Sequence, residues 1–317
     1  GLDTAALAGR RASAGPMVGE VTGFSLHRGL AIATRLDPAA EPFLDHHRID
    51  GTAVLPGVMG IEAFAEAATL LFPDRPLLAV EQVEFLAPFK FFRDEPREVE
   101  IECLFRIDGD EVVADCRLSG ARLLPGQAEP QRTLHFTGRV RLGAHGASDA
   151  APIDPDLAAL VQRAAVEGTP ALDAEAIYRV YFHGPAYRVL AAVRRSDGLL
   201  LGEMPALLPA ESRRATRCAP RAIELAFQTA GVVDLAERGR LALPARLERV
   251  RFFGAPGEAA GWRAQVRTLA GGGVSCRVAD ADGRVRMLVE GYRTVDLPEP
   301  IGPERLAPWQ ALVEAGS

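Results

Sequence analysis

The chain has 317 residues, of which 36 are basic and 42 acidic, so its formal net charge is −6, and 48% of its residues are hydrophobic. This composition is far from that of disordered chains, and the length fits one large domain or two fused ones. Charges of both signs are spread along the sequence without a basic stripe, which argues against nucleic acid as a partner. No apolar run approaches the roughly 18 residues that a membrane-spanning helix needs.

The first residues lack the uninterrupted apolar stretch of a signal peptide, so we expect a cytoplasmic protein without membrane contact. The chain starts with Gly1 rather than Met, which suggests a piece excised from a longer polypeptide or a trimmed product. Cys103, Cys116, Cys218 and Cys276 show neither CxxC spacing nor histidines at metal-ligand distance. We therefore expect reduced core cysteines and no bound metal.

Strand patterns dominate the chain. Residues 18–35 and 99–118 are apolar segments broken by turns at 27–29 and 108–110, as in β-hairpins, and residues 134–142 alternate with the period of two of a half-buried strand. The second half repeats the pattern, with strand segments at 189–204, 262–278 and 285–297.

Two long helices are predicted among these strands. The first follows Pro56-Gly57 and runs to about residue 72, and the second follows Pro220 and runs to about residue 238. Each is followed by a similar strand, at 80–88 and 247–256. This internal repeat predicts an α+β fold in which a sheet wrapped round one helix occurs twice, the arrangement of a double hotdog.

The repeat sets the predicted domain boundaries. An N-terminal hotdog covers residues 16–142 and a C-terminal hotdog covers residues 173–297. Residues 143–172 form the linker, since the stretch up to Pro170 is rich in Ala, Pro and Asp without strand alternation. Residues 298–317 are left as a C-terminal tail.

The sharpest motif reads HxxxGxxxxPG and holds His47, Gly51, Pro56 and Gly57. The first glycine permits a sharp turn, and the helix that follows opens with N–H groups that lack intrahelical partners. A base therefore lies beside donors that suit a thioester carbonyl, whose oxygen gains negative charge when the neighbouring carbon loses a proton. A lone histidine is most often structural, but this spacing favours function for His47, whereas His46 is one residue out of place.

Glu224 and Gln228 lie four residues apart on the second helix, so they share a face and the amide can hydrogen-bond the carboxyl. Apolar neighbours favour the protonated carboxyl, which can then donate a proton near neutral pH. A solvated surface glutamate is the alternative. The repeat favours function, because a pseudo-twofold packing would bring the His47 end of one half against this helix, with base and acid on either side of one substrate bond.

A third motif lies just after the linker, where Tyr181 precedes a Gly184-Pro185 turn flanked by Tyr187. Such a turn either lines a substrate channel or packs in the core, and the residues alone do not decide between the two. We count Gly184, Pro185 and Tyr187 as candidate channel residues, together with Gly51 and Pro56 of the first motif.

At these motifs the chain resembles the dehydratase domains of polyketide synthases and of polyunsaturated fatty acid synthases, over roughly residues 19–297. The family's motifs occur in order: HxxxGxxxxP at His47, Gly51 and Pro56, DxxxQ at Glu224 and Gln228, and YGPxF at residues 183–187. Two positions depart from the pattern. Glu224 replaces Asp and is one methylene longer, and His183 stands where the family often has Tyr, which puts the loop's hydrogen-bonding role in question.

The resemblance implies a hydro-lyase with a double-hotdog fold that removes water from a 3-hydroxyacyl thioester and gives a 2-enoyl thioester, without metal or organic cofactor. The substrate is carried on the phosphopantetheine of an acyl carrier protein, and other synthase domains and a second copy of the chain are further expected partners. In this reading His47 removes the α-proton and Glu224 protonates the β-hydroxyl, assisted by Tyr181. Gln228 orients the acid, and the Gly57 N–H binds the carbonyl oxygen.

Two other functions stay open on the sequence. A product-template cyclase shares the fold and the histidine–acid pair but guides aldol closure, and a silent hotdog would serve only as a scaffold in a synthase. A thioesterase is less favoured, because no nucleophile or attacking water is indicated. The pairs Arg194-Arg195 and Arg213-Arg214 suit an acidic carrier protein, although ordinary surface is the favoured account of both.

Overall fold

The structure is a computed structural model that describes residues 14–25, 27–122, 126, 129–144, 171–196, 198–254, 260–269 and 272–314. The chain divides into two compact units, one from residues 1–149 and 210–220 and the other from residues 150–209 and 221–317. Within the described ranges, no helix is both long and apolar enough to cross a membrane.

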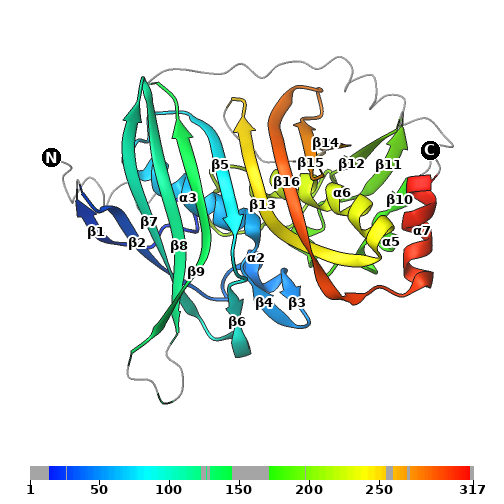
Figure 1. Cartoon of the computed structure of the whole chain (residues 1–317), viewed down its shortest axis with the longest axis horizontal. Helices are drawn as coiled ribbons and strands as arrows, with labels where there is room; N and C mark the ends of the chain where they lie inside the picture. Colours follow the sequence, from blue (N-terminus) through cyan, green and yellow to red (C-terminus); the bar gives the residue numbers. More distant parts are fainter. Residues whose placement is uncertain are drawn as a thin grey trace. The chain divides into compact units, whose positions relative to one another are not determined.

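The first unit is built on an antiparallel sheet with the strand order β1-β2-β7-β8-β9-β5, and it has a small second sheet, β3-β4-β6. Its long helix α3 contacts β5, β7, β8 and β9 (Figure 1). The elements are β1 Glu20–Ser25, β2 Gly29–Leu36, α2 Pro42–Asp45, β3 Arg48–Ile49, β4 Thr52–Val54, α3 Gly57–Leu71, β5 Leu77–Phe85, β6 Lys90–Phe91, η1 Phe92–Asp94, β7 Arg97–Asp108, β8 Glu111–Arg122 and β9 Gln131–Leu142.

The second unit has the strand order β13-β16-β15-β14-β12-β11-β10. Its long helix α6 packs on this sheet, where the ring of Phe227 stacks on Tyr292 of β16 with centroids 4.0 Å apart. The elements are β10 Ala171–Asp173, α5 Ala174–Tyr178, η2 Pro185–Tyr187, β11 Ala192–Ser196, β12 Leu199–Glu203, α6 Pro220–Arg238, β13 Arg240–Phe252, β14 Arg263–Thr268, β15 Val274–Ala279, β16 Val285–Pro300 and α7 Pro303–Glu314.

The two units repeat one strand order. Each has a hairpin, β1-β2 or β11-β12, then a long helix, and then one strand, β5 or β13. A three-stranded meander follows, β7-β8-β9 or β14-β15-β16, whose first strand pairs with the hairpin and whose last strand pairs with the strand after the helix. The predicted internal repeat and the α+β architecture are therefore confirmed.

The helix α3 is enclosed along its length, since every residue from Val58 to Leu71 is buried. Most of these side chains are apolar and fill the space against the sheet, as a helix without a solvent face requires. Two of them are carboxyls, Glu62 and Glu66, which are 0% and 2% exposed. Carboxyls at such positions need hydrogen-bond donors from the surrounding chain.

The structure differs from the sequence-based expectations at the edges of the second unit. The predicted linker, residues 143–172, lies mostly outside the described residues, but its last two residues belong to β10. A three-residue strand is too short to show alternation. The predicted tail, residues 298–317, contains the end of β16 and the helix α7, whose internal Pro308 disguises the helical pattern. All four cysteines are buried, as predicted for core residues.

The buried carboxyl of Glu66 predicts a pH dependence of stability. Burial, and then the charge of Glu62, raise the pKa of Glu66 well above its usual range. A carboxyl with a raised folded pKa stabilises the protein below its unfolded pKa, and this contribution is lost as the pH rises through the folded pKa. Glutamine keeps the shape of the neutral acid. We therefore expect the free energy of unfolding of Glu66→Gln, relative to that of wild type, to rise by more than about 1 kcal/mol between about pH 5 and about pH 8.

Urea denaturation of both proteins at several pH values measures this difference. Glu98→Gln, at an exposed position on β7 of the same unit, controls for the loss of one carboxyl and should follow wild type. A difference between Glu66→Gln and wild type that stays constant over this pH range would contradict the prediction.

Candidate functional site

His47 lies at the base of a short hairpin in the first unit. The strands β3 and β4 are joined by Asp50 and Gly51, both with positive φ (49° and 76°), the geometry of a tight two-residue turn. The predicted sharp turn at Gly51 is therefore present. Arg48 supports it by donating to the Gly51 carbonyl at 3.0 Å.

The ring orientation of His47 is fixed by the hairpin itself. Its Nδ1 lies 2.8 Å from the carbonyl oxygen of Val54, and its main-chain oxygen accepts the Val54 N–H at 3.0 Å. Because a carbonyl oxygen only accepts, the hydrogen is assigned to Nδ1, and in the neutral ring Nε2 carries the lone pair. The side chain is buried, with 8% exposure. A histidine held in one tautomer with a basic Nε2 has the form of a general base.

The helix α3 begins at Gly57, with Pro56 as its N-cap residue. Pro56 accepts from the N–H groups of Met59 and Gly60, at 3.0 and 3.2 Å. A Cβ added at Gly57 would lie 2.9 Å from the ring of Phe85, so close packing alone requires glycine there. The positive end of the helix dipole lies at this N-terminus.

In the second unit, Glu224 and Gln228 share the buried face of α6 that their spacing predicts. Gln228 Nε2 donates to Glu224 Oε1 at 2.9 Å and also to the main-chain oxygen of Tyr187 at 2.9 Å. Glu224 is 6% exposed and Gln228 is 3% exposed. The amide therefore ties the carboxyl to the segment at Tyr187, which reduces its freedom to rotate.

A tyrosine that the sequence does not single out completes this support. Tyr178 donates its hydroxyl hydrogen to Gln228 Oε1 at 2.9 Å and accepts the Leu190 N–H at 2.8 Å. The chain Leu190, Tyr178, Gln228 and Glu224 is thus a continuous series of hydrogen bonds. Since Gln228 Oε1 accepts and Nε2 donates, the amide orientation that presents a donor to Glu224 is fixed.

His183 also reaches the acid. Its Nε2 lies 3.1 Å from Glu224 Oε1, and both side chains are buried. The imidazole stacks on Phe182 with ring centroids 4.3 Å apart and meets the edge of Tyr181 at 5.8 Å. The two residues that depart from the family motifs, His183 and Glu224, are therefore in direct contact.

Tyr181 supports the helix through its backbone. Its hydroxyl donates to the main-chain oxygen of Gln228 at 2.8 Å, and its ring meets Trp309 of α7 at 5.1 Å. Burial raises the pKa of the Tyr181 hydroxyl well above its usual range, so the group stays protonated.

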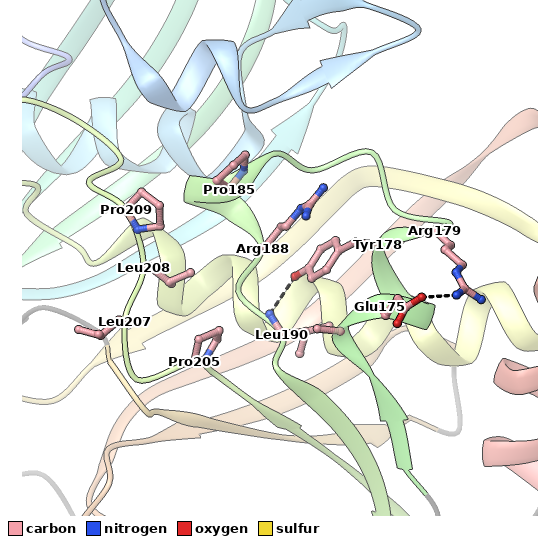
Figure 2. A pocket seen from close by; sticks show the side chains of 11 residues that line it. Glu175, Tyr178, Arg179, Pro185, Arg188, Leu190, Pro205, Leu207, Leu208 and Pro209 are labelled. Atoms are coloured by element: carbon pink, nitrogen blue, oxygen red, sulfur yellow. Dashed lines mark hydrogen bonds and ion pairs between the residues drawn. The ribbon is translucent and has the colours of Figure 1, made fainter.

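A pocket of about 720 Å³ opens beside these residues in the second unit (Figure 2). Figure 2 shows Tyr178 at its wall, with the hydroxyl bonded to Leu190 and the guanidinium of Arg188 close by. The lining residues are Ala174, Glu175, Tyr178, Arg179, Pro185, Arg188, Leu190, Pro205, Leu207, Leu208 and Pro209. A ligand in this pocket would reach Tyr178, one hydrogen bond away from Gln228.

The candidate channel residues have different environments. Pro185 lines the pocket, whereas Gly184 and Tyr187 do not, and the Tyr187 side chain is fully buried. Gly51 is exposed at its turn and Pro56 is buried at the start of α3.

The arginine pairs make contacts inside the unit to which each belongs. Arg214 donates to the main-chain oxygens of Pro16 and Val18 at 3.1 and 3.3 Å. Arg194 pairs with Glu203 at 3.4 Å, and Arg195 donates to a carbonyl of α7. These contacts give three of the four arginines a structural role.

Two family models match this chain. Residues 16–110 match the one described as the polyketide synthase dehydratase domain, and residues 154–304 match the one described as the polyketide synthase dehydratase N-terminal domain. Together the matches include the His47 hairpin, His183 and the helix α6 with Glu224.

Curated relatives are much longer than this chain. It is 28% identical over 261 residues to polyketide synthase ThaG of Burkholderia thailandensis, a match that covers 80% of this chain and 4% of the relative. It is 26% identical over 235 residues to one of the chains of the polyunsaturated fatty acid synthase from a Thraustochytrium species, covering 71% of this chain and 8% of the relative.

Solved structures share the fold. A trans-AT polyketide synthase dehydratase domain from Brevibacillus brevis has a TM-score of 0.72 at 20% identity, with 89% of this chain and 98% of that chain covered. The dehydratase domain of the CurF module of the curacin polyketide synthase has a TM-score of 0.71 at 19% identity, with 90% and 99% covered. The predicted double-hotdog fold is confirmed by these neighbours.

The hydrogen bonds of Tyr178 predict its contribution to stability. Tyr178→Phe leaves the buried Leu190 N–H and Gln228 Oε1 without this hydroxyl, so we expect a loss of about 1–3 kcal/mol in the free energy of unfolding. Tyr181→Phe removes only a donor to a helix carbonyl, and we expect it to lower the free energy of unfolding by about 0.5–1.5 kcal/mol. Urea denaturation compares the two variants, and an equal or smaller loss for Tyr178→Phe would show that its hydroxyl does not link the two groups.

Proposed function

The chain belongs to the polyketide synthase dehydratase family, a family of hydro-lyases, and we propose that it dehydrates a 3-hydroxyacyl thioester carried by an acyl carrier protein. In this proposal His47 is the general base and Glu224 the general acid. The observation that carries it is the pair of prepared side chains, one a histidine with a basic Nε2 and the other a buried carboxyl held by an amide.

The base acts first on the carbon next to the thioester carbonyl. His47 Nε2 takes the α-proton while Nδ1 keeps its hydrogen bond to the Val54 carbonyl, so the imidazolium that forms is already hydrogen-bonded. The electrons of the broken C–H bond pass to the carbonyl oxygen. The N–H at Gly57 and the positive end of α3 are the donors that we assign to this oxygen.

The acid acts on the neighbouring carbon. Protonated Glu224 gives its proton to the β-hydroxyl, the C–O bond breaks, and water leaves as the carbon–carbon double bond forms. Gln228 presents a donor to the carboxyl before and after this transfer, which stabilises the carboxylate that results. Both groups are restored when His47 passes to water the proton that it took and Glu224 takes a proton from water. Tyr181 acts through α6, whose Gln228 carbonyl it holds.

The partners of this domain are also part of the proposed function. The chain spans 4% and 8% of its curated relatives, so other synthase domains are its partners. We propose that a carrier protein, which presents the substrate, is one of them. A dehydratase in this setting acts on a chain whose β-keto group has already been reduced, because water can leave only from a hydroxyl.

We expect His47→Ala and Glu224→Ala each to lower the dehydration rate at least about a hundredfold, because a general acid or base contributes about 10²–10⁴-fold. The assay follows loss of water from a 3-hydroxyacyl N-acetylcysteamine or carrier-bound thioester by mass. His46→Ala is the matched control, since His46 is one residue outside the motif, and it should keep activity within about threefold of wild type.

If purified His47→Ala dehydrates the substrate at the wild-type rate, His47 is not the general base. Absence of dehydration by the wild-type domain on every 3-hydroxyacyl thioester, with aldol closure of a poly-β-keto thioester instead, would identify a cyclase of the product-template kind.

The contact between His183 and Glu224 predicts a further pair of variants. His183→Gln keeps a nitrogen donor near the position of Nε2, whereas His183→Phe keeps a ring and loses the hydrogen bond. A hydrogen bond to a charged group is worth about 1.5–3 kcal/mol, so we expect His183→Phe to lower kcat at least about tenfold and His183→Gln to stay within about threefold. Equal losses in both variants would mean that the imidazole itself transfers a proton.

A further inference from the structure

The strongest polar cluster outside these residues lies inside the first unit, on the enclosed helix α3. The two oxygens of Glu62 serve two different residues of the segment that precedes α6. Oε1 accepts the N–H of Arg217, and Oε2 accepts the N–H of Cys218 at 2.9 Å and its Sγ–H at 2.9 Å. Glu62 and Cys218 are each 0% exposed.

The other buried carboxyl of α3, Glu66, hydrogen-bonds a different part of the chain. Glu66 Oε2 accepts the N–H of Met17 at 2.9 Å, so its hydrogen bond holds the N-terminal segment. The two glutamates are four residues apart and both are buried, yet it is Glu62 that accepts from the segment leading into α6.

The start of α6 lacks the side-chain cap that usually fixes a helix terminus, and in its first turn Arg221 donates to the main-chain oxygen of Pro209 at 2.8 Å. Its first residue, Pro220, has no N–H, and the residue before it, Ala219, has no side-chain acceptor that could cap the first turn. The first turn also contains no acidic residue. Ala219 has φ 50°, a left-handed conformation that is costly for alanine and persists only where the surroundings impose it.

Glu62 supplies that constraint. By holding the N–H groups of Arg217 and Cys218, its carboxylate fixes the two residues ahead of Ala219 and therefore the residue at which the helix begins. Glu224 lies six residues after Cys218, and only Ala219 separates Cys218 from the start of α6. A helix turns by about 100° per residue, so a slip of one residue at its start would turn the acid away from its direction.

We propose that Glu62 is a positioning residue for the dehydration, in that its buried carboxylate fixes the start of α6 and thereby the direction of Glu224. This inference rests on the proposed function. It assigns Glu62 no contact with the substrate.

Glu62→Gln tests the proposal. A glutamine offers one oxygen and one NH₂ group, so it cannot accept from both Arg217 and Cys218, whose N–H groups lie on different oxygens. We expect kcat to fall at least about tenfold with KM within about twofold, because the acid is misdirected while the binding surface is kept. Glu66 also interacts with Glu62, and a glutamine in place of Glu66 keeps an acceptor for the Met17 N–H and a donor toward Glu62, as the neutral acid does. Glu66→Gln is therefore the matched control on the same helix and should keep kcat within about twofold.

Hydrogen exchange gives a readout that does not depend on activity. In Glu62→Gln the amides of Arg217, Cys218 and the first turn of α6 should exchange at least about tenfold faster, and in Glu66→Gln they should exchange as in wild type. Unchanged exchange or unchanged kcat in Glu62→Gln overturns the inference, as does an equal loss of kcat in both variants. A wild-type domain without dehydratase activity would instead overturn the proposed function, and the exchange result would still stand.

If Glu62→Gln does not fold, Glu62→Asp takes its place. Aspartate keeps the charge and both acceptors but withdraws them by about one carbon–carbon bond, so the same changes in exchange and kcat are expected. Wild-type kcat and wild-type exchange in a folded Glu62→Asp protein would overturn the inference equally.

Discussion

A helix enclosed on every side must find a partner for each polar side chain that it carries, because an unpaired buried polar group costs more than the hydrogen bond is worth. This constraint organises the first unit. The helix α3 is buried from Val58 to Leu71, and its two carboxyls are paired with main-chain N–H groups at Met17, Arg217 and Cys218. The carboxyls therefore gather distant parts of the chain around the helix.

The same constraint operates on α6 in the second unit. Its buried Glu224 and Gln228 make polar contacts with Tyr178, His183 and the Tyr187 carbonyl. All three lie in the short segment that runs from the end of α5 to η2. That segment has little regular structure of its own, so its conformation follows from the helix side chains that it satisfies. The acid and its supports consequently form one hydrogen-bonded group.

Turns, helix starts and contacts between residues close in sequence could be predicted from the sequence, because short-range interactions determine them. The turns at residues 108–110 and at Gly51 follow from Asp-Gly pairs, α3 and α6 follow from their opening prolines, and the Glu224–Gln228 hydrogen bond follows from a four-residue spacing. The internal repeat predicted the double hotdog, and the resemblance to dehydratases implied the same fold.

Partners far apart in the sequence could not be predicted in this way. Tyr178 and Gln228 are 50 residues apart, and Glu62 and Cys218 are 156 apart, so no periodicity links them. The motif around residue 183 did mark the loop that touches the acid, and the histidine there was the available signal for that contact. The helix α7 was missed because Pro308, a residue that usually breaks helices, lies inside it.

The repeated strand order has an evolutionary consequence. Both units have a long helix preceded by a short entry segment, but the first has a histidine in the hairpin ahead of its helix, and residues 210–219 ahead of the second contain none. The second unit has instead developed an amide-supported acid within its helix. Duplication of an ancestral half would have allowed this division of labour, in which one copy carries the histidine ahead of its helix and the other carries the acid within it.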